Sequence, residues 1–109
     1  MPETLINPVQ PQLNTAQKKF LKGIAHGLNP VVMIGANGLT DAVIQELDQA
    51  LSHHELVKIK IAADERSERK AMIEQMTKQT QAQSLQAIGK IVVLLRVNID
   101  SPLLAELPR

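Results

Sequence analysis

The chain has 109 residues, of which 44% are apolar and 21% are charged, and this composition indicates one globular domain rather than a disordered segment. Its net charge of +1 excludes a uniformly basic nucleic-acid binder. The absence of cysteine excludes disulfides and thiolate metal sites, and the longest apolar run, residues 91–95, is too short to span a membrane. Residues 1–12 do not resemble a signal peptide, so we expect a cytoplasmic protein.

Charge is distributed unevenly along the sequence. Residues 14–38 contain three lysines and no acid, whereas residues 39–55 contain four acids and no lysine or arginine. A basic face suits RNA, and an acidic segment suits a basic protein partner. Both modes of interaction therefore stay open at this point.

A first helix is predicted from Asn14 or Thr15, which are capping residues, to about Gly27. Three prolines precede it, so residues 1–12 are expected to be a flexible lead-in. We expect its apolar stripe to be buried; the stripe comprises Phe20, Leu21, Ile24 and Leu28. The opposite face is basic and carries Lys18, Lys19, Lys22 and His26. Such a face suits phosphate, although lysines also serve as an ordinary solvated surface.

A strand, a glycine loop and a second helix are predicted next. Residues 31–34 are continuously apolar, which indicates a strand buried on both faces. The loop Gly35-Ala36-Asn37-Gly38 follows, and Thr40 is the expected N-cap of a helix that ends near residues 53–54. Two glycines permit close approach of a ligand backbone, and the helix N-terminus attracts an anion such as phosphate. Glycines also serve simply to turn the chain, which is their commoner use.

The second half predicts a strand, a helix and a hairpin. In residues 56–61 apolar and basic side chains alternate, so Lys58 and Lys60 are expected to face away from the core. We attribute these two lysines to a solvent-facing sheet edge. Asp64 can cap a helix to about Thr80, and residues 84–88 and 91–96 form a hairpin. Arg96, at its end, either reaches phosphate or pairs with an acid. The residues after position 98 show no period that requires folding.

This order of elements predicts a single α/β domain, arranged α-β-α-β-α-β-β, with one mixed sheet. The patterns of nucleotide-binding loops, G-x-x-x-x-G-K-[ST] and G-x-G-x-x-G, are both absent. His53 and His54 are adjacent and diverge on a helix, so they do not form a metal pair. We therefore expect no catalytic residue, no metal, no cofactor and no small-molecule substrate.

Several segments together resemble the CRM domain, the YhbY-like RNA-binding module, in its bacterial stand-alone form. They are AHGLNPVVMIG at residues 25–35, GLT at 38–40, ALSHHELVKIK at 50–60, IGK at 88–90 and VLLR at 93–96. The resemblance covers about residues 14–97 and implies a fold similar to the C-terminal domain of translation initiation factor 3. We accordingly expect a lead-in at residues 1–12, an RNA-binding domain at 13–97 and a tail at 98–109.

The resemblance also implies binding of highly structured RNA, in precursors of the large ribosomal subunit, by the glycine loop and neighbouring basic surface. The expected interface comprises Lys18, Lys19, Lys22, His26, Gly35, Ala36, Asn37, Gly38 and Arg96. Many members have a lysine inside the loop, where this chain has Ala36 and Asn37, and often a tyrosine at the position of Leu95. With Phe20 as the single aromatic residue, we expect shape and phosphate contacts rather than base stacking.

Two alternatives stay beside this hypothesis. A protein–protein interaction module would dock through the acidic second helix, with the glycine loop as a plain turn. A small enzyme acting on RNA would need an acid, a base or a nucleophile, and the sequence nominates none.

Overall fold

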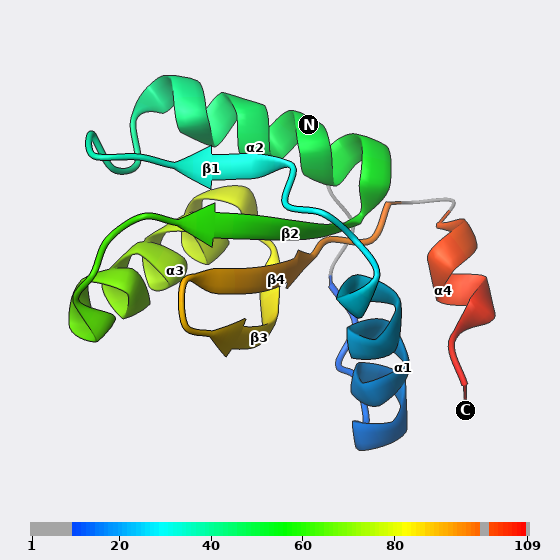
Figure 1. The fold of residues 1–109 in the computed structure, drawn as a ribbon. Helices are drawn as coiled ribbons and strands as arrows, with labels where there is room; N and C mark the ends of the chain where they lie inside the picture. The colour runs from blue at the N-terminus through cyan, green and yellow to red at the C-terminus, as the bar shows by residue number, and fades with distance from the viewer. Residues whose placement is uncertain (1–9, 99–100, 109) are drawn as a thin grey trace.

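The computed structural model describes residues 10–98 and 101–108 (Figure 1). Within them the elements are α1 (Thr15–His26), β1 (Val32–Ile34), α2 (Asp41–His54), β2 (Leu56–Ile61), α3 (Arg66–Thr80), β3 (Gln83–Ile88), β4 (Ile91–Leu95) and α4 (Pro102–Glu106). The order up to β4 confirms the predicted α-β-α-β-α-β-β arrangement. No helix in this described part is long and apolar enough to cross a membrane.

The strands form one mixed sheet in the order β1-β2-β4-β3. β1 and β2 are parallel, because α2 carries the chain back between them, whereas β4 is antiparallel to both of its neighbours. β2 is therefore a central strand. The interpretation of Lys58 and Lys60 as protection for a sheet edge was wrong, since the edges are β1 and β3.

Helices α2 and α3 cover one face of the sheet. The inward side of β2, made by Val57, Ile59 and Ile61, packs there with Leu47 of α2 and Met76 of α3. As predicted, Thr40 caps α2, its side chain accepting a hydrogen bond from the Val43 amide at 3.2 Å. α3 has Glu65 as its N-cap residue, one position after the predicted Asp64, and Glu65 makes no side-chain capping bond.

Helices α1 and α4 cover part of the opposite face. Leu21 and Ala25 of α1 are buried there against Leu56 and Leu95, and Leu103 and Leu107 pack against the same cluster. A folded C-terminal segment was not predicted. The sequence of α4 is too short to show a helical period, so its packing partners could not be identified from it.

Partial cover on this side explains two further errors of prediction. Phe20, Ile24 and Leu28 are each 37% exposed, because α1 turns Leu21 and Ala25 toward the sheet instead. Met33 of β1 is 62% exposed, because no helix lies over it, so β1 is buried on one face only.

The lead-in was expected to be flexible, but its last residues lie against the sheet. The Gln10 side chain donates to the Val97 carbonyl at 3.2 Å and accepts from the Val97 amide at 2.7 Å. Gln83 donates to the Pro11 carbonyl at 3.0 Å. Asn14 then caps α1 in a reciprocal capping box with Gln17. The remainder of the predicted lead-in, residues 1–9, lies outside the described residues.

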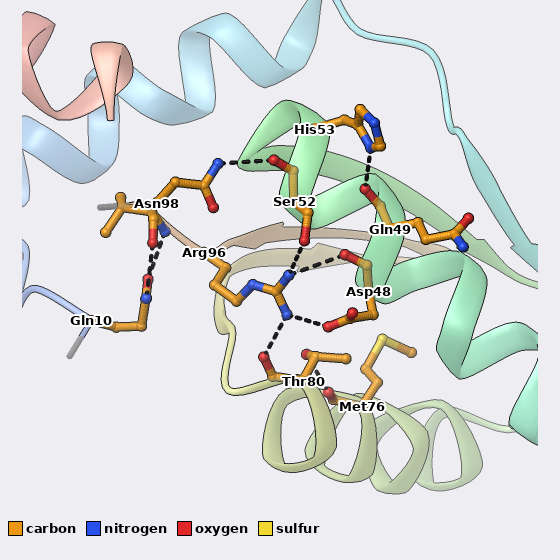
Figure 2. Close-up of polar contacts among 10 residues, drawn as sticks. Gln10, Asp48, Gln49, Ser52, His53, Met76, Thr80, Arg96 and Asn98 are labelled. Atoms are coloured by element: carbon orange, nitrogen blue, oxygen red, sulfur yellow. Dashed lines mark hydrogen bonds and ion pairs between the residues drawn. The ribbon is translucent and has the colours of Figure 1, made fainter. Parts of the chain in front are cut away.

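Arg96 follows β4 and is only 1% exposed, with its guanidinium enclosed by α2 and the end of α3 (Figure 2). Its Nη1 donates to Asp48 Oδ1 at 2.6 Å and to the Thr80 carbonyl at 3.0 Å. Its Nη2 donates to the Asp48 carbonyl at 3.0 Å and to Ser52 Oγ at 2.8 Å. Of the two roles open from the sequence, Arg96 takes the acid-pairing one, and we withdraw it from the RNA interface because it cannot reach a ligand.

The Arg96→Ala variant tests this clamp. Removing a buried, multiply bonded guanidinium leaves the Thr80 carbonyl and Ser52 without a partner, so we expect the free energy of unfolding to fall by about 3 kcal/mol or more. The matched control is Arg66→Ala, since Arg66 is exposed and its loss should cost less than about 0.5 kcal/mol. Chemical denaturation measures both, and equal effects of the two substitutions would contradict a clamping role.

Candidate nucleic-acid interface

The glycine loop leaves the carboxyl end of β1 as a fixed turn. The Ile34 carbonyl accepts a hydrogen bond from the Ala62 amide at 2.9 Å, which holds the end of the strand against the chain after β2. The Gly38 amide donates to the Gly35 carbonyl at 3.1 Å and closes the turn. The loop is thus built into the sheet rather than hanging from it.

The two glycines have different roles. Gly38 has a φ of +70°, which disfavours any residue with a Cβ, and an added Cβ would stand 3.7 Å from Met72 Cε of α3. Gly35 has no positive φ, and nothing lies within 4 Å of a Cβ built on it. Gly38 is therefore required by the turn itself, whereas Gly35 leaves open space in which another molecule can approach.

Backbone donors surround that space. The amides of Ala36 and Asn37 make no hydrogen bond with the described part of the chain. The amides of Asp41 and Ala42 at the start of α2 also point out of the helix, whereas the Val43 amide is already bonded to the capping Thr40. Asp41 opposes them, because its carboxylate in the first turn offsets the positive end of the helix dipole. The loop therefore offers donors for phosphate without a lysine.

The basic face of α1 borders the part of the sheet that α1 does not cover. Lys18, Lys19 and His26 are exposed and Lys22 is half-buried. A hollow of about 140 Å³ separates His26 from the sheet, and it is lined there by residues of β2, β3 and β4 that include Lys58, Gln86 and Ile88. Lys22 lies one helical turn from His26 on the same side of α1, so the C-terminal end of the basic face is the part nearest this open half of the sheet.

The structure does not place α1 and the glycine loop next to each other. α1 precedes β1 and the loop follows it, so they lie at opposite ends of the sheet (Figure 1). Lys58 and Lys60 lie between them on β2, on the same face as α1. These two lysines were left out of the expected interface, although their alternation with Val57, Ile59 and Ile61 had already assigned them to the face away from the core.

A salt bridge fixes the chain around the loop end of the sheet. Lys90, in the turn between β3 and β4, donates to Asp64 Oδ1 at 2.9 Å, and the Lys90 carbonyl accepts from the Ile61 amide at 2.7 Å. The hydrogen bond and charge of Lys90, with a smaller contribution from Arg69, hold the pKa of Asp64 below its usual value. Asp64 thus stays ionised to lower pH than a free aspartate, and the bridge is lost as the pH falls through that lowered pKa.

The acidic segment is largely used inside the molecule. Asp48 pairs with Arg96, and Glu55 is 4% exposed and accepts a hydrogen bond from the Asn98 amide at 2.7 Å. Of the four acids between residues 39 and 55, this leaves Asp41 and Glu46 without such a structural task. Within α2 itself, one of the three acids, Asp48, is thus committed to an internal ion pair, which weakens the alternative of docking through an acidic helix.

Proteins of similar sequence carry names that refer to RNA. A Haemophilus influenzae protein named RNA-binding protein is 47% identical over 97 residues, which cover 89% of this chain and 96% of the relative. A probable RNA-binding protein of Pseudomonas aeruginosa is 42% identical over 86 residues, and the match covers 79% of this chain and 83% of the relative. A probable RNA-binding protein of Bacillus subtilis is 30% identical over 96 residues, and the match covers 88% of this chain and 99% of the relative. None of these three is named as an enzyme.

The same architecture occurs in a solved structure. The solution structure of a Staphylococcus aureus hypothetical protein, described as a candidate RNA-binding protein, superimposes with a TM-score of 0.75 at 28% identity. The match covers 89% of this chain and 100% of that protein. The model of the CRS1 / YhbY (CRM) domain matches residues 13–96 of the sequence. The chain therefore belongs to the CRM domain family, as its segments had indicated.

Proposed function

We propose that this protein binds structured RNA, and that its target is ribosomal RNA in precursors of the large subunit. The observation that carries the proposal is the open space beside Gly35, next to the unbonded amides of Ala36 and Asn37. The names of the relatives support RNA as the ligand. The narrower choice of large-subunit precursors rests on the family resemblance.

The expected contacts are mainly to phosphates. Backbone amides of the loop donate to one stretch of the RNA backbone, and Lys18, Lys19 and Lys22 neutralise another. His26 extends the second contact toward the sheet. Because the loop and α1 lie at opposite ends of the sheet, one ligand must span both to use both. A folded RNA or a ribonucleoprotein surface provides that span in a rigid form, and binding at one end then favours binding at the other.

Replacing Lys18 and Lys22 together with alanine tests the helix contribution. Each lost phosphate contact should lower the slope of log affinity against log salt by about one, so we expect the double variant to lower it by about two. The control is Lys78→Ala, on the outer face of α3, which should leave the slope unchanged. Filter binding to a large-subunit rRNA fragment across a salt series measures all three proteins. An unchanged slope in the double variant would exclude α1 from the interface.

Gly35→Asp tests the loop without disturbing the turn. The new side chain enters open space, so we expect stability to change by less than about 0.5 kcal/mol, while RNA affinity falls at least about tenfold through repulsion of phosphate. Gly35→Asn is the matched control of the same size, and it should lose less affinity. The loop contact is wrong if Gly35→Asp is folded and binds as the wild type does.

Gly38→Ala should affect folding before binding. Holding alanine at a φ of +70° costs about 1–2 kcal/mol, so we expect a lower midpoint of thermal unfolding than in Gly35→Ala. Differential scanning calorimetry compares the two variants. Equal midpoints would show that the loop turn relaxes to accept a Cβ at position 38.

A further inference from the structure

The face of the sheet that α1 leaves uncovered carries a continuous row of side chains across all four strands. Strand register aligns Met33 of β1 with Lys60 of β2, Lys60 with Ile91 of β4, and Ile91 with Ile88 of β3. Met33 is 62% exposed and Ile88 is 65% exposed. A sheet face open to water is normally polar, yet three of the four residues in this row are apolar. Exposed apolar groups gathered in this way mark a binding surface.

The next row of the same face adds charge. Lys58 pairs with Val93 of β4, which also pairs with Gln86 of β3, and His26 lies over this row across the 140 Å³ hollow. Neither Lys58 nor Lys60 forms an ion pair with a described residue, and no acid lies in either row. Because β2 is a central strand, these lysines have no edge to protect. Their placement is explained if they meet an anionic ligand.

We propose that this open sheet face binds unpaired nucleotides of the RNA, between the contacts made by α1 and by the glycine loop. Lys58 and Lys60 contact the phosphates, while Met33 and Ile88 pack against exposed bases. The inference deepens the proposed function and rests on it. Two facts favour RNA over a protein as the occupant: the two rows contain cations and no acid, and Met33 is two residues before Gly35, so the face continues directly into the loop.

The apolar row selects unpaired RNA. A double helix keeps its bases stacked inside and offers phosphates and ribose hydroxyls, which leave Met33 and Ile88 without a matching surface. Unpaired bases expose flat apolar faces that aliphatic and thioether side chains can cover. Base stacking was not expected from the sequence, because Phe20 is the single aromatic residue of the chain. The row of aliphatic side chains offers apolar contact with bases in place of aromatic stacking.

Two hairpin RNAs with the same stem and the same compact, internally stacked loop test this inference, one with a blunt end and one with a single-stranded extension of about six nucleotides. Fluorescence anisotropy of labelled RNA gives the affinity for each. We expect the wild type to bind the extended hairpin about tenfold more tightly, and we expect Met33→Ser and Lys60→Gln to remove that preference while retaining affinity for the blunt hairpin. The control is Leu28→Ser, which alters a partly exposed apolar residue that follows α1 and lies outside both rows, and it should keep the preference.

The outcomes separate the two proposals. If the wild type binds both hairpins equally, or if the Met33 and Lys60 variants keep the preference, the sheet face is not a site for unpaired RNA, while RNA binding by the loop and α1 stands. That result would leave the face to a protein partner. If the wild type binds neither hairpin nor a large-subunit rRNA fragment, both proposals fall.

Methyl NMR spectra of the wild type provide a readout that does not depend on a folded variant. The extended hairpin should shift the methyl resonances of Met33 and Ile88, and the blunt hairpin should shift them much less. Met76, which is fully buried on the other side of the sheet, is the internal reference. Unmoved Met33 and Ile88 resonances in a saturated complex would overturn the proposal.

Discussion

The two-residue alternation of β2 organises this protein. Val57, Ile59 and Ile61 point to the face covered by α2 and α3, while Lys58 and Lys60 point to the opposite face. A shift of one residue would bury two lysines and expose three core side chains, so the register of the central strand is tightly fixed. The register of β2 therefore determines which face of the sheet the helices α2 and α3 cover. The face that carries Lys58 and Lys60 is the one left partly open.

Charged residues have different roles on the two faces of the sheet. On the covered side, Arg96 uses its donors on Asp48, Ser52 and the Thr80 carbonyl, and joins α2, α3 and β4 (Figure 2). On the open side, the lysines of β2 have no such partners among the described residues. A buried cation whose Nη1 and Nη2 atoms donate to internal partners stabilises the fold, and a cation without an internal ion pair is available to a ligand.

Much of this arrangement followed from the sequence, because local signals were strong. Asn14 and Thr40 mark helix starts by their capping chemistry, and the strand order along the chain followed from hydrophobic period. What failed depended on tertiary position. Sequence could not show that β2 is central or that Arg96 is enclosed. The helix α4 was not predicted because its sequence shows no local helical pattern. Leu103 in α4, and Leu107 directly after it, instead pack against the hydrophobic cluster under α1.

We expect RNA to meet the open side of the sheet and its two ends, and not the outer surfaces of α2 and α3. Backbone amide NMR of the protein with a folded large-subunit rRNA fragment distinguishes these surfaces. The amides of His26, Ala36, Asn37 and Lys60 should shift, and those of Glu46 in α2 and Glu74 in α3 should stay unchanged. Shifts gathered on α2 and α3, with the loop and the open face unmoved, would contradict it.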